Sequence, residues 1–329
     1  MEDLRSIIRI PEIWDSLSTV EERLLEAATA DDAYLTKIAQ HLLLAGGKRF
    51  RPLLALLAAE FGPARDRRPI EAAVSVELIH VGSLYHDDVI DESDTRRGAS
   101  SVNANWSNTV AILAGDFLMA RASEVAATHL SQESVRLLAH TYADLVEGQT
   151  RELQLEGDFT HSFEDYEKVI GGKTASLVKT SARLGALAAD ADDSVVEALS
   201  TWAWEVGMVF QIADDALDLV ADGETIGKPA GSDIREGTYT MPVLAAAQST
   251  DGARVRELLS PGIPFADETV EEVIDLVRTG GHIDDALDSA RARLRVAEDA
   301  LQSLPAGLPK DILSELGVFL LARVERARG

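Results

Sequence analysis

The long stretch between Pro69 and Pro229 contains no proline, although the chain of 329 residues has 10 of them. Proline breaks helices because it lacks an amide hydrogen and clashes with the preceding turn. From about Ile70 to Gly223 the chain is rich in Ala and Leu, and its apolar residues recur at helical spacing, most clearly over 72–90 and 194–220. Alternating strand patterns are nearly absent. We therefore predict an all-α fold, a single large helical bundle with one domain over residues 1–329.

Polar, glycine-rich stretches separate the later helices. Residues 221–240 and 262–269 are predicted to be loops, and Gly280–Gly281 divides the last helices.

The charge balance limits the partners. The chain has 31 Lys and Arg against 56 Asp and Glu, a net charge of −25, which argues against binding to nucleic acid or to an anionic membrane surface. It has no cysteine, which excludes disulfides and thiolate chemistry. The acidic N-terminus does not resemble a signal peptide, and no apolar run approaches the roughly 18 residues of a membrane-spanning helix. We expect a cytoplasmic protein without an integral membrane segment.

Three copies of an Asp-Asp-x-x-Asp pattern stand out. The first two lie late in predicted apolar helices, and the third follows Gly280–Gly281–His282 at the start of a helix. Clustered carboxylates in an apolar helix are costly without a partner, and oxygen ligands of this kind favour Mg²⁺. Asp residues at a helix start instead cap free amides, so we interpret the third copy as solvated surface. The three copies are Asp87, Asp88 and Asp91; Asp214, Asp215 and Asp218; and Asp284, Asp285 and Asp288.

Basic residues follow glycines or acidic clusters at several places. Glycine lets the backbone approach an anion closely, and Lys and Arg neutralise phosphate oxygens. A Gly-Gly-Lys run alone is more often the end of a helix. Together with two acidic clusters, these segments indicate two diphosphate sites, one bridged by metal and one held by cations. The segments are 46–52 (GGKRFRP), 96–98 (RRG), 171–174 (GGKT) and 227–229 (GKP).

Five motifs in this order resemble those of the trans-isoprenyl (polyprenyl) diphosphate synthases. They are GGKRFRP, IHVGSLYHDDVIDESDTRRG, GGKTASL, FQIADDALD and GKPAGSDIREG, and they span residues 46–237. The resemblance implies an enzyme of the isoprenoid synthase fold with a deep central cavity. Such an enzyme condenses an allylic diphosphate with isopentenyl diphosphate to give a longer all-trans polyprenyl diphosphate and diphosphate.

The resemblance also implies roles for residues at the matching positions. Two or three Mg²⁺ ions would be held by Asp87, Asp91, Asp214 and Asp218, with Asp88 and Asp215 supporting them. The allylic diphosphate would contact Arg96, Lys173, Thr174, Gln211 and Lys228. Isopentenyl diphosphate would contact Lys48, Arg51, His80 and Arg97. The chain departs from the family at Gly237-Thr238-Tyr239-Thr240, where many members carry a lysine.

Product length in the family depends on bulk before the first acidic cluster. Short-chain members often have an aromatic residue five positions before its first Asp, whereas this chain has Gly82 there, followed by Ser83. We therefore expect open space at Gly82 and a product of 20 carbons or more.

Two other functions are weighed against this one. A class I terpene cyclase shares the fold but usually has a single Asp-rich cluster and no second diphosphate to bind. A regulatory subunit of a heteromeric synthase would be expected to have degenerate clusters, and both are intact here. The family leads us to expect a homodimer.

Overall fold

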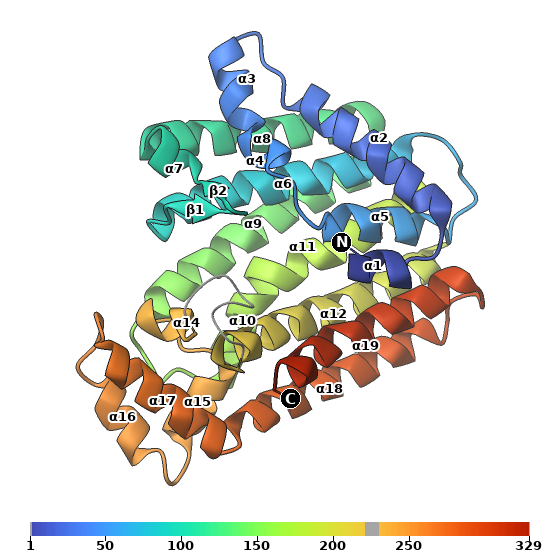
Figure 1. Ribbon diagram of the computed structural model, residues 1–329. Coiled ribbons are helices and arrows are strands. Elements are labelled where there is room, and N and C mark those ends of the chain that lie inside the picture. Colours follow the sequence, from blue (N-terminus) through green and yellow to red (C-terminus); the bar gives the residue numbers. More distant parts are fainter. Residues whose placement is uncertain (1, 221–229, 329) are drawn as a thin grey trace. The chain divides into compact units, whose positions relative to one another are not determined.

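The computed structural model describes residues 2–220 and 230–328, and it is almost entirely helical (Figure 1). The all-α prediction is confirmed. The helices up to the middle of the chain are α1 (Glu2–Ile7), α2 (Pro11–Ala27), α3 (Ala33–Ala39), α4 (His41–Leu44), α5 (Phe50–Ala59), α6 (Arg68–Ile90), α7 (Val102–Asn105), α8 (Asn108–His129) and α9 (Gln132–Leu155). The later ones are α10 (Phe163–Ile170), the π-helical turn η1 (Gly171–Ala175), α11 (Ser176–Ala188), α12 (Asp193–Val220), α14 (Ser232–Arg235), α15 (Met241–Gln248), α16 (Ala253–Leu259), α17 (Asp267–Thr279), α18 (His282–Leu301) and α19 (Leu308–Arg328).

By their internal contacts the residues form two compact units, each assembled from several stretches of chain. Unit 1 comprises Met1–Tyr142, Leu177–Ser200 and Ser303–Ile312, and unit 2 comprises Ala143–Ser176, Thr201–Gln302 and Leu313–Gly329. Helices α9, α11, α12 and α19 contribute residues to both. That the whole chain forms one domain therefore stays a prediction.

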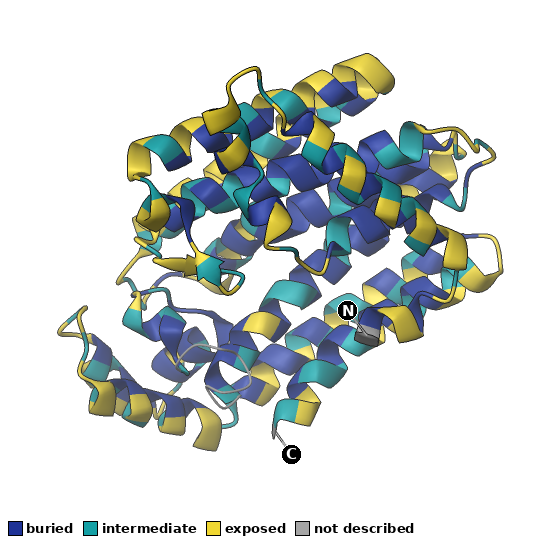
Figure 2. Ribbon diagram, turned by 45° about the horizontal axis from the view of Figure 1, so that its top comes forward, coloured by how far each residue is buried: buried dark blue, intermediate teal, exposed yellow. Residues whose placement is uncertain are grey.

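Helix α6 is the centre of unit 1, where it packs against α8, α5 and α2. Buried residues, dark blue in Figure 2, run along α5 and α6, whereas α2 and α8 also carry many exposed ones. Residues 71–79 of α6 are buried without interruption, and the two carboxylates among them, Glu71 and Glu77, are paired with arginines. From His80 onward one face becomes partly accessible, and it bears Ser83 and Asp87. The first acidic cluster therefore lies at the end of α6 that reaches the surface, beyond the buried stretch of the helix.

A short hairpin follows α6, and helical periodicity did not predict it. Strand β1 (Thr95–Arg96) pairs antiparallel with β2 (Ala99–Ser100), with Thr95 opposite Ser100. The two turn residues, Arg97 and Gly98, have φ values of 55° and 76°. Positive φ at both central residues is the geometry of a tight two-residue hairpin turn. The hairpin holds two adjacent arginines, of which Arg96 contacts Asp88 near the end of α6 and Arg97 contacts Glu77 further back along the helix.

In unit 2, α15 packs against α16, α17 and α18. The 230–240 part of the predicted loop contains the short helix α14, and the rest of that loop, 221–229, lies outside the described residues. Helix α18 begins at His282, so the third acidic cluster occupies a helix start, as predicted. Asp284, Asp285 and Asp288 are all exposed. None of the described helices is long and apolar enough to cross a membrane.

Candidate active site

The first acidic cluster occupies the C-terminal end of α6. Asp91 is the residue that ends the helix, and its amide donates to the carbonyl of Asp87 at 2.8 Å. Asp87 is half-buried and Asp91 is exposed, whereas Asp88 is fully buried. The C-terminal end of a helix carries partial negative charge, so carboxylates there favour a bound cation.

Asp88 is held by Arg96 of the hairpin. Two nitrogens of the Arg96 guanidinium, Nε and Nη2, each lie 2.6 Å from Oδ1 of Asp88. The other carboxylate oxygen, Oδ2, is buried and has no hydrogen-bond partner among the described residues. Burial raises the pKa of Asp88, and the positive charge of Arg96 acts in the opposite direction. Arg96 thus fixes Asp88 against the core, while its own side chain stays 30% exposed.

An arginine cluster, formed by Arg49, Arg51 and Arg97, surrounds one turn of α6 in unit 1. Glu77 is buried at its centre, with Oε1 at 2.9 Å from Nη1 of Arg49 and 3.8 Å from Nη2 of Arg97. Nη1 of Arg51 lies 3.3 Å from Nε2 of His80. Burial, reinforced by these arginines, lowers the pKa of His80 well below its usual value, so the ring is neutral. Three guanidinium groups face two carboxylates, Glu77 and Glu21, which leaves a net positive site suited to a polyanion.

The three cations of GGKRFRP have different surroundings. Arg49 is buried at the start of α5 with a φ of 48°, and it bonds to Glu21 and to the carbonyl of Leu43 in addition to its contact with Glu77. Lys48 is exposed and Arg51 is half-buried. Arg49 is therefore a structural anchor, while its neighbours on either side are the ones that a ligand can reach.

Gly47 allows Arg97 to approach the same loop. A Cβ atom at Gly47 would lie 3.1 Å from the guanidinium carbon of Arg97. Nη1 of Arg97 donates to the carbonyls of Gly46 at 2.5 Å and of Leu42 at 3.2 Å. The hairpin and the glycine-rich loop are thereby tied together around the cluster.

The second acidic cluster lies in the last two turns of α12, in unit 2. Asp214 is exposed, and its Oδ1 lies 3.8 Å from Nη2 of Arg323 on α19. Asp215 and Asp218 are both buried, at 4% exposure. The amide of Asp233 donates to Oδ2 of Asp218 at 3.3 Å. As in the first cluster, the carboxylates stand near the negative end of a helix dipole.

A chain of hydrogen bonds surrounds Asp215. Tyr166 donates its hydroxyl to Oδ2 at 2.5 Å, and Nε2 of Gln211 donates to Oδ1 at 2.8 Å. Oε1 of Gln211 in turn accepts from the Thr174 hydroxyl at 2.7 Å. Burial raises the pKa of Asp215 to about 7, although the bonds from Tyr166 and Gln211 act to lower it. The sequence indicated Thr174, Gln211 and Asp215, but Tyr166 was missed because its only signal is its place one helical stretch before Gly-Gly-Lys-Thr.

Lys173 and Thr174 belong to η1, which continues α10 into α11. Gly-Gly-Lys is therefore not a helix end, contrary to the commoner meaning of that run. Lys173 forms an ion pair with Glu152 of α9. Gly148 of α9 meets the turn so closely that a Cβ atom there would lie 2.6 Å from the amide nitrogen of Lys173. A π-helical turn often marks a functional site. Here it contains Lys173 and Thr174, two adjacent residues predicted to contact the allylic diphosphate.

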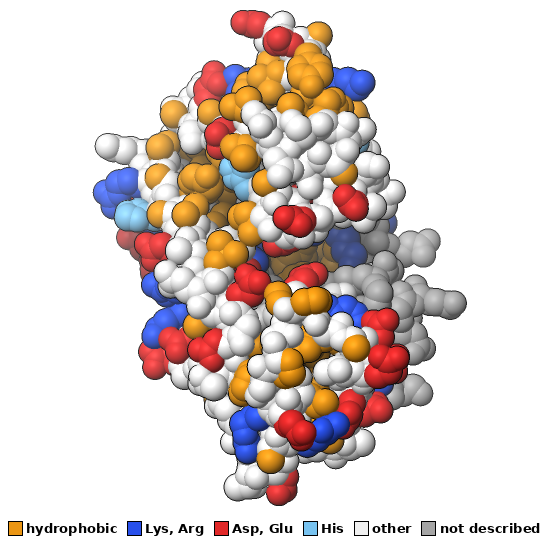
Figure 3. All heavy atoms as spheres, turned by 90° about the vertical axis from the view of Figure 1, so that its left-hand side faces the viewer, with side chains coloured by type: hydrophobic (Ala, Val, Ile, Leu, Met, Phe, Trp, Pro, Cys, Tyr) orange, Lys and Arg blue, Asp and Glu red, His pale blue; other side chains and the backbone are white. Residues whose placement is uncertain are grey.

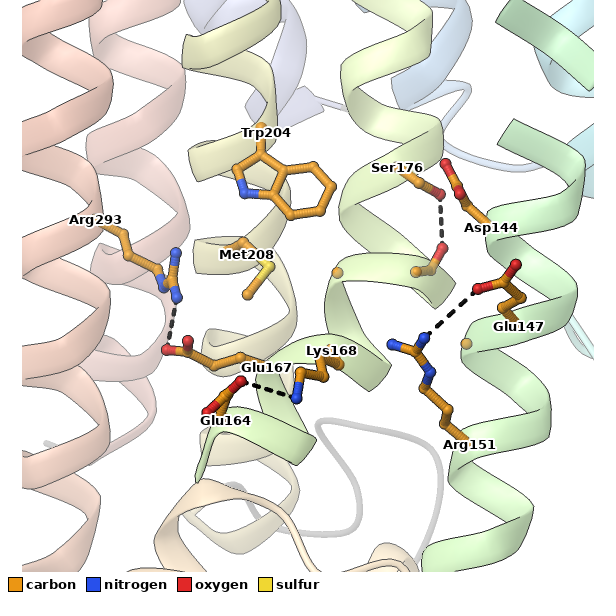
Figure 4. A pocket seen from close by; sticks show the side chains of 13 residues that line it. Asp144, Glu147, Arg151, Glu164, Glu167, Lys168, Ser176, Trp204, Met208 and Arg293 are labelled. Carbon is orange, nitrogen blue, oxygen red and sulfur yellow. Dashed lines mark hydrogen bonds and ion pairs between the residues drawn. The ribbon is translucent and has the colours of Figure 1, made fainter. Parts of the chain in front are cut away.

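The glycines of η1 face a separate cavity of about 400 Å³. Figure 4 shows Trp204 and Met208 of α12 on one side of it and the Glu147–Arg151 pair of α9 on the other. A Cβ atom at Gly171 would meet the Trp204 ring at 3.1 Å. The rim of this cavity carries both acidic and basic side chains, most of which are paired with each other. The cavity therefore shows no preference for an anionic or a cationic ligand.

Gly82 does not border open space, and this corrects our expectation for that position. A Cβ atom there would lie 3.0 Å from Cε of Met119 and 3.1 Å from the carbonyl oxygen of Gly115, because α8 packs closely against α6 here. Ser83 is instead half-buried on the partly accessible face of α6, one turn before Asp87, and its hydroxyl donates to the carbonyl of His80.

Comparison with known proteins decides the family. The model of the polyprenyl synthetase family matches residues 32–277. The chain belongs to the polyprenyl synthetase family. A nonaprenyl diphosphate synthase from Mycobacterium tuberculosis is 40% identical over 324 residues, covering 98% of this chain and 96% of that protein. The enzyme is thus a prenyltransferase, a trans-polyprenyl diphosphate synthase, and the cyclase and regulatory-subunit alternatives are not favoured.

Solved structures of the family agree with this fold. A geranylgeranyl pyrophosphate synthase from Corynebacterium glutamicum, complexed with calcium and isoprenyl diphosphate, is 40% identical with a TM-score of 0.85, covering 95% of this chain and 96% of that one. A polyprenyl synthase from Caulobacter crescentus, with the same ligands, is 32% identical with a TM-score of 0.89, covering 97% and 98%.

The carboxylates of this synthase fit a divalent cation in a particular way. Among the residues that the structure describes, no three His, Asp or Glu side chains are gathered to hold a metal by themselves. Mg²⁺ usually takes only one or two protein carboxylates and completes its shell with water and substrate phosphate. Pairs of oxygen donors at helix ends, with an unpartnered buried oxygen on Asp88, meet that requirement.

Each unit of the synthase brings part of the predicted set together. In unit 1, Arg96 contacts the first acidic cluster, and Arg51 and Arg97 lie around His80. In unit 2, Gln211 and Thr174 are linked to the second cluster by hydrogen bonds. Lys173 pairs with Glu152, whose charge acts on Asp215 of that cluster. Lys228 lies outside the described residues. Besides Tyr166, the sequence missed Glu77 and Glu152, since nothing local distinguishes a carboxylate that pairs with a distant cation from a solvated one.

Proposed function

We propose that the two acidic clusters bind two or three Mg²⁺ ions, which hold the allylic diphosphate during its ionisation. Asp87 and Asp91 from α6, and Asp214 and Asp218 from α12, are the proposed ligands. The observation that carries this is the repeated placement of an acidic cluster at the C-terminal end of a long helix, with basic groups close by. Carboxylates there are unfavourable without a cation.

We further propose that basic and polar side chains hold the two substrates. Arg96, Lys173, Thr174 and Gln211 would contact the allylic diphosphate. Lys228 is proposed for the same role from the family motif alone. In the arginine cluster, the neutral His80 ring and the guanidinium of Arg51 suit isopentenyl diphosphate. The exposed Lys48 and the Arg97 guanidinium would complete that second diphosphate site.

In the family reaction, departure of diphosphate leaves an allylic cation, which the isopentenyl double bond attacks before a proton is lost. Bound Mg²⁺ supplies positive charge that stabilises the leaving diphosphate. The chain's own contribution is to orient the two diphosphates and to keep donors aimed at the oxygens on which charge develops. Tight binding of both diphosphates brings the reacting carbons together. The released diphosphate can accept the final proton, so no side chain is assigned as the base.

Thr238 replaces the lysine that many members carry after the second cluster. We propose that the remaining contacts, chiefly Lys173, suffice for the allylic diphosphate.

We propose a product of 20 carbons or more. The support is the small residues Gly82 and Ser83, five and four positions before Asp87, together with the nonaprenyl diphosphate synthase among the relatives.

We also propose that the synthase works as a homodimer in the cytoplasm. Ile112 and Leu113 on α8 are 44% and 60% exposed, which is unusual for two adjacent large apolar residues of a helix. Acidic and basic side chains are interspersed on the face shown in Figure 3, as on most solvated surfaces. Light scattering after size exclusion measures the dimer directly, and Leu113→Glu should weaken it.

The site assignment is tested with matched substitutions in the real and look-alike clusters. Asp214→Asn should lower kcat at least 100-fold and raise the Mg²⁺ concentration needed for half-maximal activity. Asp288→Asn removes a carboxylate from the same pattern on α18, where it pairs with surface Arg291, and should leave activity within twofold. Elongation of an allylic diphosphate with isopentenyl diphosphate is followed by mass analysis. Equal effects of the two substitutions would refute the assignment.

A further inference from the structure

A chain of three side-chain hydrogen bonds cross-links α10, η1 and α12 within unit 2. Tyr166 stands on α10 just before the π-helical turn, and Thr174 stands on the turn itself. Both are buried, and both bond to the same stretch of α12, Tyr166 to Asp215 and Thr174 to Gln211. Gln211 and Asp215 are four residues apart on one helical face, and they bond to each other. The four side chains therefore form one continuous chain of contacts.

The direction of each bond follows from the groups involved. Both oxygens of Asp215 accept, one from the Tyr166 hydroxyl and one from Nε2 of Gln211. A carboxylate oxygen that accepts the Nε2 hydrogen would repel the amide oxygen of Gln211, so this bond sets the orientation of the amide. Oε1 of Gln211 is then left to accept the Thr174 hydrogen. Within the part of the chain that the structure describes, Nε2 of Gln211 donates to Asp215 alone, so its second hydrogen can serve a substrate oxygen.

We propose that Tyr166 is a positioning residue for the allylic diphosphate, acting through Asp215 on Gln211. This inference rests on the proposed function, because it takes Gln211 and Thr174 to be diphosphate contacts. By holding one oxygen of Asp215, the Tyr166 hydroxyl keeps the other aimed at Nε2 of Gln211. Without the Tyr166 hydroxyl, the carboxylate of Asp215 is free to rotate. The Gln211 amide then loses the acceptor that decides whether its nitrogen or its oxygen faces the substrate.

The alternative is a purely structural role, in which Tyr166 only fills space in the core. Its side chain is 4% exposed, and a buried tyrosine commonly finds some partner for its hydroxyl. The two roles differ in what they change. A core tyrosine affects stability and acts equally on both substrates, whereas a positioning residue on the allylic side alters one Michaelis constant and spares the other.

The experiment compares Tyr166→Phe with a matched control, Tyr239→Phe. Tyr239 is also buried in unit 2, but its hydroxyl has no hydrogen-bond partner among the described residues, so its loss removes no contact. Steady-state kinetics are measured with each substrate varied in turn. We expect Y166F to raise KM for the allylic diphosphate roughly tenfold, the loss typical of one hydrogen bond to a charged group, with KM for isopentenyl diphosphate within twofold. Y239F should change neither.

A double substitution tests the route through Gln211. Y166F should have less than a twofold effect on the allylic KM when Gln211→Leu is already present, because the group on which Tyr166 acts is gone. Tyr166→His, whose ring can still donate to Asp215, should recover part of the loss, and it serves as the second variant if Y166F does not fold.

Three results would overturn the inference: an unchanged allylic KM in Y166F, a parallel rise in both Michaelis constants, or an undiminished effect in the Q211L background. Asp214→Asn is assayed beside them. If that substitution abolishes activity as proposed while Y166F is indistinguishable from Y239F, only the role of Tyr166 fails. If D214N is fully active, the site assignment itself fails.

Discussion

The guanidinium of Arg96 lies 2.6 Å from Oδ1 of Asp88, a side chain with no exposed surface at all. The middle Asp of the first acidic cluster is thus not a member of the accessible set but a buried anion with one dedicated cation. Asp215, the middle Asp of the second cluster, is likewise buried and held by Tyr166 and Gln211. In both clusters the second Asp ties the motif to the protein interior.

Arg96→Ala should destabilise the protein by about 3 kcal/mol at pH 8, because it leaves a buried carboxylate without its cation. The loss should shrink at pH 5. Burial raises the pKa of Asp88, and without Arg96 it rises further, so the folded variant takes up a proton as the pH falls and the uncompensated charge disappears. Guanidinium chloride unfolding at both pH values measures this, with the exposed Arg136→Ala as control. An equal loss at pH 5 and pH 8 would contradict it.

His80 should make the protein less stable in mild acid. Its folded pKa is depressed by burial and by Arg51, Arg97, Arg49 and Arg96, so between that value and about 6.5 only the unfolded chain binds a proton. Stability is therefore fully present above pH 6.5 and falls as the pH is lowered, by about 1 kcal/mol between pH 7.5 and 5.5. His80→Gln should remove this part of the pH dependence. The measurement is the difference in unfolding free energy between wild type and variant at the two pH values, and a constant difference would rule the effect out.

Gly148 should tolerate no side chain, whereas Gly171 should accept one. In Gly148→Ala the new Cβ would lie 2.6 Å from the backbone nitrogen of Lys173, and backbone cannot move aside cheaply. In Gly171→Ala it would meet side chains instead, the Trp204 ring at 3.1 Å and Sδ of Met208 at 3.9 Å. We expect a loss of about 2–3 kcal/mol for G148A, with reduced activity because Lys173 is displaced, and less than about 1 kcal/mol for G171A. Thermal unfolding and the elongation assay of both variants test the contrast, which fails if the two behave alike.

Ser83→Phe should shorten the product. Ser83 lies on the partly accessible face of α6, one turn before Asp87, so an aromatic ring there projects beside the proposed metal ligand. Gly82→Phe, by comparison, would force α6 away from α8 and chiefly destabilise the protein. Mass analysis of the polyprenyl diphosphates from wild type, S83F and Ser83→Ala decides the matter. Products of the same length from all three would show that Ser83 does not limit elongation.

Much of the fold could be predicted from local patterns. The apolar periodicity over 72–90 and 194–220 corresponds to α6 and α12, because helices of that length depend on residues three and four apart along the chain. The third acidic cluster was correctly assigned to the surface because a glycine pair precedes it, and Asp at a helix start is favourable by itself. The hairpin at 95–100 was missed, since two-residue strands have no periodicity to detect.

By itself, the sequence determined that the chain is helical, where its acidic clusters stand on the helices, and which family of reactions its motifs resemble. These follow from spacing along one chain. Only the tertiary structure decided that Asp88 and Asp215 face inward, that Arg49 is an anchor while Arg51 is half-buried, that Gly82 packs against α8, and that Tyr166 reaches Asp215. Adjacent residues of a helix point about 100° apart, so identical side chains receive opposite roles according to what packs against each face, and that partner comes from elsewhere in the chain.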